Sequence, residues 1–207
     1  MKSGLAIIIL SLTVCLSGPA VAQQGLKGPT GNIDPEGESD TELRTPRLPL
    51  DPEQRAEELR LSGKCQQAIP IYRNMVALGG FEIAQFHLGL CLLDVSKTES
   101  DAQRAAALKQ EAANIIIKAA NGGLANAQIQ LVSLYLDGIG VPVDPVEAGK
   151  WALIYHANGS RFVISLPDIS PELQARLDGV LNATSWAEAQ SRANSWSPPT
   201  RNWDASR

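Results

Sequence analysis

The chain has few of the residues from which metal sites and catalytic centres are most often built. It contains two histidines, three cysteines and 5% aromatic residues in 207 positions. His87 and His156 are not spaced with cysteine, histidine or aspartate in any pattern typical of zinc ligands. The sequence also lacks the Gly-x-Ser-x-Gly motif of hydrolases and any recognisable cysteine–histidine pair. We therefore predict no catalytic residues, no metal site and no cofactor.

Long hydrophobic runs are scarce too, and the one that is present lies at the N-terminus. Lys2 precedes an apolar run at 5–16, and residues 20–22 (Ala-Val-Ala) then present small side chains where a signal peptidase reads. This combination is typical of a secretory signal peptide, so we predict cleavage after residue 22. The alternative is an uncleaved membrane anchor, although the run is shorter than the roughly 20 apolar residues that span a bilayer.

The chain also has fewer basic than acidic residues. The chain carries 18 basic and 22 acidic residues, a formal net charge of −4. Removing residues 1–22 takes away only Lys2 among the charged residues, so 17 basic and 22 acidic residues remain and the net charge becomes −5. Nucleic acids and anionic membrane surfaces attract clustered positive charge. We therefore predict no nucleic-acid partner, no membrane contact after signal cleavage, and a periplasmic or secreted location.

Two segments look unable to form a core of their own. Residues 23–50 contain four prolines, repeated glycine and few large aliphatic residues without helical or strand period. Such a segment cannot bury enough apolar surface to offset its ordering entropy, so we predict a disordered linker. A peptide that binds a partner is the alternative. Residues 198–207 are predicted to form a mobile tail, in which Trp203 either folds back or contacts a partner.

From Asp51 onward the sequence is patterned for helices. Asp51 and Pro52 are typical of a helix start, because an N-cap carboxylate accepts a backbone N–H and proline fits the first helical position. Apolar residues then recur at helical intervals, glycines end the segments, and no sustained period-two alternation indicates a strand. The expected helices are 52–62, 65–78, 82–93, 101–121, 124–136 and 145–157, with two more that start at Ser170 and at Thr184 or Ser185.

These helices contain an internal repeat. Gly80, Gly123 and Gly159 mark equivalent positions, separated by 43 and then 36 residues. The difference of seven residues is accounted for by one insertion at 94–100 (DVSKTES), which we interpret as a longer loop. Repeats of this length indicate a solenoid, in which each helix pair buries its apolar face against its neighbours.

One repeat unit matches a known pattern: an Ala/Leu/Tyr helix, a Gly-x-Gly-Val-x-x-Asp turn, and an Ala-x-x-Trp helix that ends in glycine. The matching residues are Ala127, Leu131, Tyr135, Gly138, Gly140, Val141, Asp144, Ala148, Trp151 and Gly159. This pattern resembles the Sel-one-like repeat family, which is related to tetratricopeptide repeats. The match is specific over residues 112–159 and weaker over 65–111. Tyr155 and His156 stand where the family has two alanines, so a standard repeat is not expected to follow.

The resemblance implies an all-α fold: a short right-handed solenoid of stacked antiparallel helix pairs, with about eight helices. The predicted domains are a signal peptide at 1–22, a disordered linker at 23–50, repeats at 51–159, capping helices at 160–197 and a mobile tail at 198–207. The Gly138–Val141 segment is then a turn between helices. It lacks the third glycine, the lysine and the preceding strand of a phosphate-binding loop.

Two cysteines remain after signal cleavage, Cys65 and Cys91. They lie 15 and 11 residues from the turn at Gly80, on helices expected to be antiparallel neighbours. The mismatch of four residues is about 6 Å along the helix axes, which tilt can absorb. An exported protein meets an oxidising compartment, so we predict a disulfide, with two buried free thiols as the alternative.

The predicted function is protein binding. Solenoids present extended faces for partners, and the resemblance implies a role in assembling envelope complexes or in signalling. We expect an adaptor whose concave face binds a protein or peptide. The candidate binding residues are Gln85, His87, Gln128, Gln130 and Ser133. The alternative is an enzyme that acts on the cell wall, or an accessory of such an enzyme.

Overall fold

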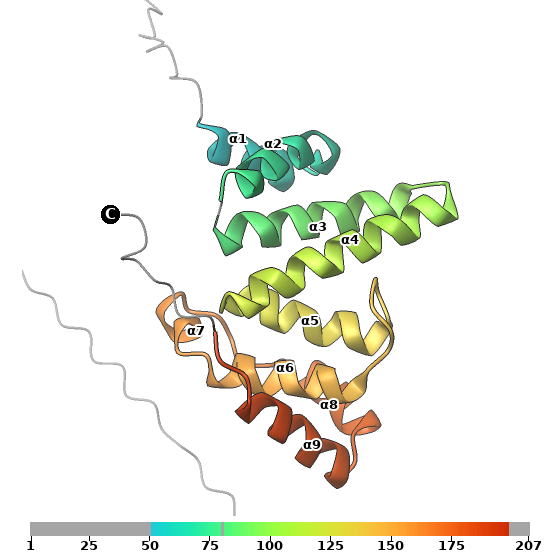
Figure 1. Ribbon diagram of the computed structural model, residues 1–207, viewed down its shortest axis with the longest axis vertical. Coiled ribbons are helices and arrows are strands. Elements are labelled where there is room, and N and C mark those ends of the chain that lie inside the picture. Colours follow the sequence, from blue (N-terminus) through green and yellow to red (C-terminus); the bar gives the residue numbers. More distant parts are fainter. Residues whose placement is uncertain (1–50, 80, 199–207) are drawn as a thin grey trace, which may run out of the picture. The chain divides into compact units, whose positions relative to one another are not determined.

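The computed structural model describes residues 51–79 and 81–198, all within one compact unit, Pro46–Arg207. Every regular element in this part of the chain is a helix (Figure 1), so the predicted all-α fold is confirmed. The predicted signal peptide, linker and Trp203 lie outside the described residues, as does Gly80. None of the helices in 51–198 is long and apolar enough to cross a bilayer.

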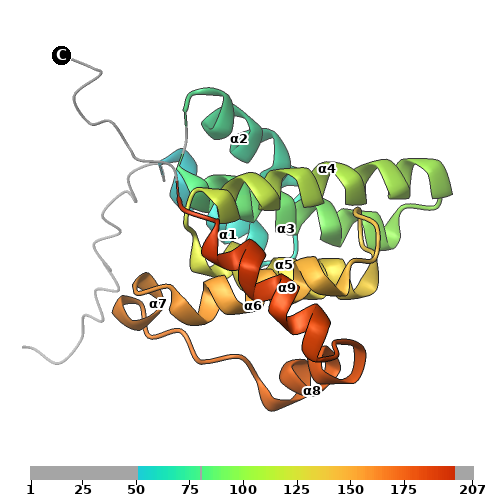
Figure 2. The same ribbon diagram turned by 60° about the horizontal axis from the view of Figure 1, so that its bottom comes forward.

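The helices follow one another through the stack. Each of α1 to α5 packs on the next helix in the chain, and α6 then packs mainly on α9 and less on α8. Figure 2 shows α8 and α9 together at the end of the stack. The bounds are α1 Pro52–Leu61, α2 Cys65–Ala77, α3 Glu82–Thr98, α4 Ala102–Asn121, α5 Ala125–Asp137, α6 Pro145–Ala157, α7 Ser160–Val163, α8 Pro171–Val180 and α9 Ala183–Asn194.

Side-chain caps start five of the described helices, α1, α4, α6, α8 and α9. The carboxylates of Asp51 and Asp144 accept the backbone N–H groups of Gln54 and Glu147 at 2.8 and 2.9 Å. The Ser170 hydroxyl caps α8 in the same way. Helix α9 begins at Ala183, one or two residues before the predicted start at Thr184 or Ser185, and its cap is Asn182, whose Oδ1 accepts the Ser185 N–H at 2.9 Å. An asparagine carbonyl satisfies an N-terminal amide as well as a hydroxyl does.

The seven-residue insertion is helix for most of its length, so its interpretation as a longer loop was wrong. Helix α3 continues to Thr98 and is 17 residues long, beside the 20 residues of α4. The inserted stretch contains no glycine or proline that would end a helix. Ser96 within it is only 4% exposed and donates to the Leu93 carbonyl at 2.7 Å. The extra turn therefore lengthens the α3–α4 pair.

The turn between α5 and α6 depends on its two glycines. Gly138 and Gly140 have φ angles of +65° and +72°, in the left-handed region that favours glycine. At Gly140 space is also decisive, because an added Cβ would overlap the carbonyl of Lys109 in α4. The turn therefore lies directly against the preceding repeat.

Two apolar clusters form the core, and α3 and α4 contribute to both. The first lies among α1 to α4 and includes Tyr72, Leu88 and Leu92. The second extends from α3 to α9 and is centred on Leu131 and Trp151. Since both clusters share helices, the helix pairs form a continuous stack.

The end of the stack is irregular, as the departures at Tyr155 and His156 predicted. Helix α6 is followed by the four-residue α7 and an extended stretch before α8. The Tyr155 hydroxyl donates to the Pro167 carbonyl at 2.6 Å and so holds that stretch against α6. Trp196, just after α9, meets Trp151 edge-on with ring centroids 5.9 Å apart. The C-terminal helices therefore close the core.

Candidate binding site

The five residues predicted to line a binding face differ in how far they are buried. Gln85, His87, Gln130 and Ser133 are half-buried. Gln128 is completely buried, which makes its placement on an open face wrong. Its amide donates to the Ala120 carbonyl at 3.3 Å and accepts from Asn158 at 2.8 Å. It therefore joins α4, α5 and the end of α6, because a buried amide is stable only when its hydrogen bonds are made internally.

His87 lies at a cavity between the first three helices, which we name the α1–α3 cavity. Its volume is about 320 Å³, at the lower end of the range for ligand pockets. Helix α1 and its cap supply polar side chains, and α2 and α3 supply most of the apolar wall. The lining residues are Asp51, Glu53, Gln54, Glu57, Tyr72, Met75, Ile83, Ala84 and His87.

A hydrogen-bonded network centred on Glu57 forms the polar side of this cavity. The Tyr72 hydroxyl donates to Glu57 Oε2 at 3.0 Å, and His87 Nδ1 lies 3.2 Å from the same oxygen. Arg60 donates to both carboxylate oxygens, through Nε to Oε2 at 2.8 Å and through Nη2 to Oε1. Three helices therefore place one group each around a single carboxylate.

The network shifts the pKa values of its members in directions that fix their charges. The hydrogen bond from Arg60 lowers the pKa of Glu57 from 4.5 to about 2, with a further lowering by Tyr72. Burial and the adjacent carboxylate raise the pKa of Tyr72. For His87, burial lowers the pKa below 6.5, although the charge of Glu57 opposes this. At neutral pH the site therefore holds an anionic carboxylate, a phenol and a neutral imidazole.

The carboxylate also fixes which imidazole nitrogen carries the hydrogen. The Tyr72 hydroxyl gives its hydrogen to Glu57, and His87 Nδ1 lies 3.5 Å from that hydroxyl and 3.2 Å from Glu57 Oε2, so we assign the hydrogen of neutral His87 to Nδ1. Its Nε2 is then an acceptor. That atom has no hydrogen-bond partner among the described residues, and it is not one of their fully buried unpartnered atoms. Nε2 is therefore not fully buried, and it belongs to a side chain that lines the cavity.

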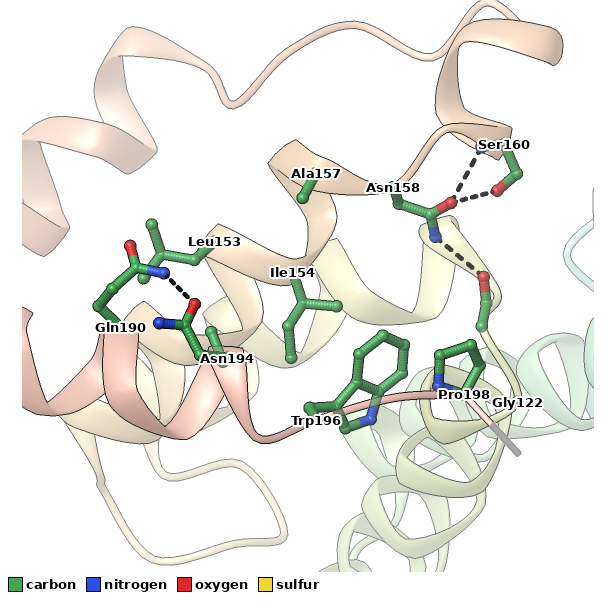
Figure 3. A pocket seen from close by; sticks show the side chains of 12 residues that line it. Gly122, Leu153, Ile154, Ala157, Asn158, Ser160, Gln190, Asn194, Trp196 and Pro198 are labelled. Atoms are coloured by element: carbon green, nitrogen blue, oxygen red, sulfur yellow. Dashed lines mark hydrogen bonds between the residues drawn. The ribbon is translucent and has the colours of Figure 1, made fainter. Parts of the chain in front are cut away.

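Two further cavities lie near the other end of the stack. The larger, about 500 Å³, lies between the α4–α5 turn, α6 and α9 (Figure 3). Its main polar group, Asn158, donates to the Gly123 carbonyl at 2.9 Å and accepts from Ser160, so it is occupied within the fold. The third, about 440 Å³, contains His156, whose Nδ1 lies 3.1 Å from an exposed Asp168 carboxylate. The α1–α3 cavity is distinguished by its acceptors that remain free.

The two histidines lie in different parts of the stack, and neither forms a metal-binding group with other described residues. His87 and His156 each pair with one carboxylate, on separate parts of the stack. Within residues 51–79 and 81–198, no group of three or more His, Cys, Asp or Glu residues is arranged to hold a metal ion.

The two cysteines meet in the first core cluster. Cys65 begins α2 and Cys91 lies in α3, and both are buried free thiols in the structure. The Cys91 side chain is in hydrogen-bonding contact with that of Cys65. Burial and this contact raise the pKa of the Cys91 thiol. The helix register places the pair together as expected, and the disulfide stays a prediction.

Comparison with known proteins finds similarity to solved structures. No protein-family model matches the chain, and no curated protein matches it. A solved structure does: a protective antigen present in uropathogenic Escherichia coli strains, which displays an SLR (Sel-one-like repeat) fold. The two are 27% identical with a TM-score of 0.51, over 69% of this chain and 29% of that one. The chain has a Sel-one-like repeat fold.

The repeat residues occupy the positions that this fold requires. Ala127, Leu131, Ala148 and Trp151 are at most 1% exposed, inside the stack. The turn glycines are left-handed and Asp144 caps α6. The residues that identify the Sel-one-like repeat therefore serve packing. The chain spans less than a third of the length of the similar protein.

Only one member of the Glu57 network, His87, was predicted from the sequence. Glu57, Arg60 and Tyr72 were not. The Glu57–Arg60 pair has a visible signal, an acid and a base three residues apart on one helix face. Tyr72 has none, because its partners lie 15 residues away in each direction.

Proposed function

We propose that this Sel-one-like repeat protein is a protein-interaction scaffold of the bacterial envelope, without catalytic activity of its own. The α1–α3 cavity carries the proposal. It presents free hydrogen-bond acceptors beside apolar surface, while the repeat residues themselves are used in packing. Scaffold solenoids bind through such faces and pockets. The fold of the similar structure supports the same class of function.

Export is part of the proposal. It is supported by the charged, apolar and small-residue segments at 1–22, and by the similar structure being that of a protective antigen. Mass spectrometry of the protein recovered from outside the cytoplasm should find Gln23 as its first residue. Recovery of the intact N-terminus in the cytoplasmic fraction would contradict export.

We also propose that Cys65 and Cys91 form a disulfide in the exported protein. The contact between their side chains supports this, since a disulfide forms only between cysteines that already lie close together. The bridge would close a 26-residue loop, worth about 3.5 kcal/mol in the chain-entropy view.

A crosslinking pulldown from envelope extracts tests the scaffold. The full chain with a C-terminal tag is the bait, and a tagged, unrelated exported protein is the control. We expect one protein partner at stoichiometric level, absent from the control. Failure to capture any partner, together with hydrolysis of cell-wall material by the purified chain, would replace the scaffold with the enzyme.

A further inference from the structure

The α1–α3 cavity has a one-sided charge. Among residues 51–79 and 81–198, no lysine or arginine lines it, whereas three carboxylates do, all from α1 and its cap: Asp51, Glu53 and Glu57. The nearby Arg60 is held by two hydrogen bonds to Glu57. The mature chain is itself acidic, so its wider field has the same sign. An anionic ligand is disfavoured here on both grounds.

The free acceptors of the cavity are distinct from the Glu57 network. The Glu57 oxygens already accept three hydrogen bonds, two from Arg60 and one from Tyr72, and His87 Nδ1 lies 3.2 Å from one of them. The remaining acceptors are Nε2 of His87, the carboxylate of Glu53, the Asp51 oxygen that does not cap α1, and the amide oxygen of Gln54. A ligand that satisfies these atoms must present N–H or O–H donors.

The opposite wall is aliphatic. Met75 and Ile83 are half-buried there, and Ala84 is 2% exposed. A wholly apolar ligand would cover this wall but leave the acceptors without partners, at a cost of about 1–3 kcal/mol for each one desolvated. A ligand with an aliphatic stem and a cationic donor end satisfies both walls. Lysine and arginine side chains have this build, with an apolar stem that packs and a charged end.

We infer that the α1–α3 cavity receives a lysine or arginine side chain of a partner polypeptide, an assignment that rests on the proposed scaffold function. The stem lies on Met75 and Ile83, and the cationic end donates to His87 Nε2 and to the carboxylates of Asp51 and Glu53.

The site is preorganised for this role. Glu57 holds His87 from one side, and its own position is fixed by Arg60 and by Tyr72, which is 1% exposed. The imidazole therefore needs no reorientation when a ligand arrives, which lowers the entropic cost of binding. Glu57 and Tyr72 act as positioning residues, and His87, Asp51 and Glu53 make the contacts.

The methyl group of Met75 provides a specific NMR probe of the cavity. Met75 lines it and is the only methionine besides Met1, so ¹³C-methyl methionine labelling gives a signal that reports on this site. The ligands to titrate are N-acetyl-lysine methylamide, its norleucine analogue, which keeps the stem without the charge, and N-acetyl-glutamate methylamide. We expect the lysine compound to shift the Met75 signal at concentrations at least tenfold lower than the other two.

Charge-matched variants locate the contact. Asp51→Asn keeps the helix cap, and together with Glu53→Gln it should weaken lysine binding by about 5- to 20-fold, as expected for two partly exposed pairs. Glu58→Gln is the control, because Glu58 is an exposed acid on α1 outside the cavity. Equal binding of norleucine, or equal loss in both variants, would overturn the inference. A difference in the Met75 methyl signal between the Arg47→Gln variant and the wild type, with no ligand added, would also overturn the inference. Arg47 of the chain itself would then be the occupant of the cavity.

The pulldown separates this inference from the scaffold proposal. A partner captured by the wild type and lost in the Asp51→Asn, Glu53→Gln variant supports both. Equal capture by the two leaves the scaffold standing and overturns the cavity assignment. Lysine binding with no captured partner overturns the scaffold, and with it the polypeptide as source of the side chain.

Discussion

Gly140 and Gly63 form a matched pair that tests how closely the helix pairs stack. Both glycines have a φ of +72°, so replacement by alanine imposes the same backbone strain at each. Around Gly63 an added Cβ meets nothing within 4 Å. At Gly140 it would overlap the Lys109 carbonyl, which belongs to the backbone and cannot turn aside, and it would lie 3.0 Å from the Ala113 Cβ.

The two costs can be estimated separately. A left-handed alanine costs about 1–2 kcal/mol, partly offset by the less flexible unfolded chain. Gly63→Ala should therefore lower the free energy of unfolding by about 1 kcal/mol. Gly140→Ala adds an overpacking cost of about 1–3 kcal/mol, so its total is about 2–4 kcal/mol. In a domain of this size, the melting temperature should fall by about 2–4 °C and about 5–15 °C respectively.

Thermal and urea unfolding followed by far-ultraviolet circular dichroism measure both values. Both variants are studied in reducing buffer, so that the cysteines contribute equally. Losses that agree within about 0.5 kcal/mol would refute the reasoning. They would mean that the α5–α6 turn does not approach the backbone of α4 as the structure shows, and that Gly140 serves conformation alone.

Two further predictions concern the first three helices. The pKa of Glu57 is depressed to about 2, so its ion pair stabilises the fold fully above pH 4.5 and loses that contribution as pH falls towards 2. Since Glu57 is one third exposed, this amounts to about 1–2 kcal/mol. The stability gap between wild type and Glu57→Gln in urea unfolding should shrink over that range, and a gap independent of pH would count against the network. For Cys65 and Cys91, alkylation and mass spectrometry of the exported protein should find no reactive thiol before reduction, whereas two alkylated cysteines would rule out the bridge.

Local chemistry allowed much of the fold to be predicted. The caps at Asp51, Asp144 and Ser170, and the left-handed glycines at 138 and 140, depend on interactions within a few residues. Such interactions are visible in the order of residues alone. The repeat spacing added the stacking, because helix pairs of this kind cannot bury their apolar faces singly.

Errors arose where distant packing decides. No local stop ends α3 at Leu93, and its extra turn persists because α4 runs beside it. Gln128 is polar and was placed on the surface, but partners from α4 and the end of α6 satisfy its amide inside the stack. A polar side chain reveals its need for hydrogen bonds in sequence, while the source of those bonds is a property of the tertiary structure.

The sequence by itself determined that this chain is helical, repeated and acidic, and which of its residues hold the repeats together. Only the tertiary structure decided how those residues of the first three helices that are not part of the repeat pattern are arranged. Glu57, Tyr72 and His87 meet because three short antiparallel helices return the chain to the same level. That register depends on turns and packing, and it converts an ordinary acid, phenol and imidazole into one polar wall of a cavity.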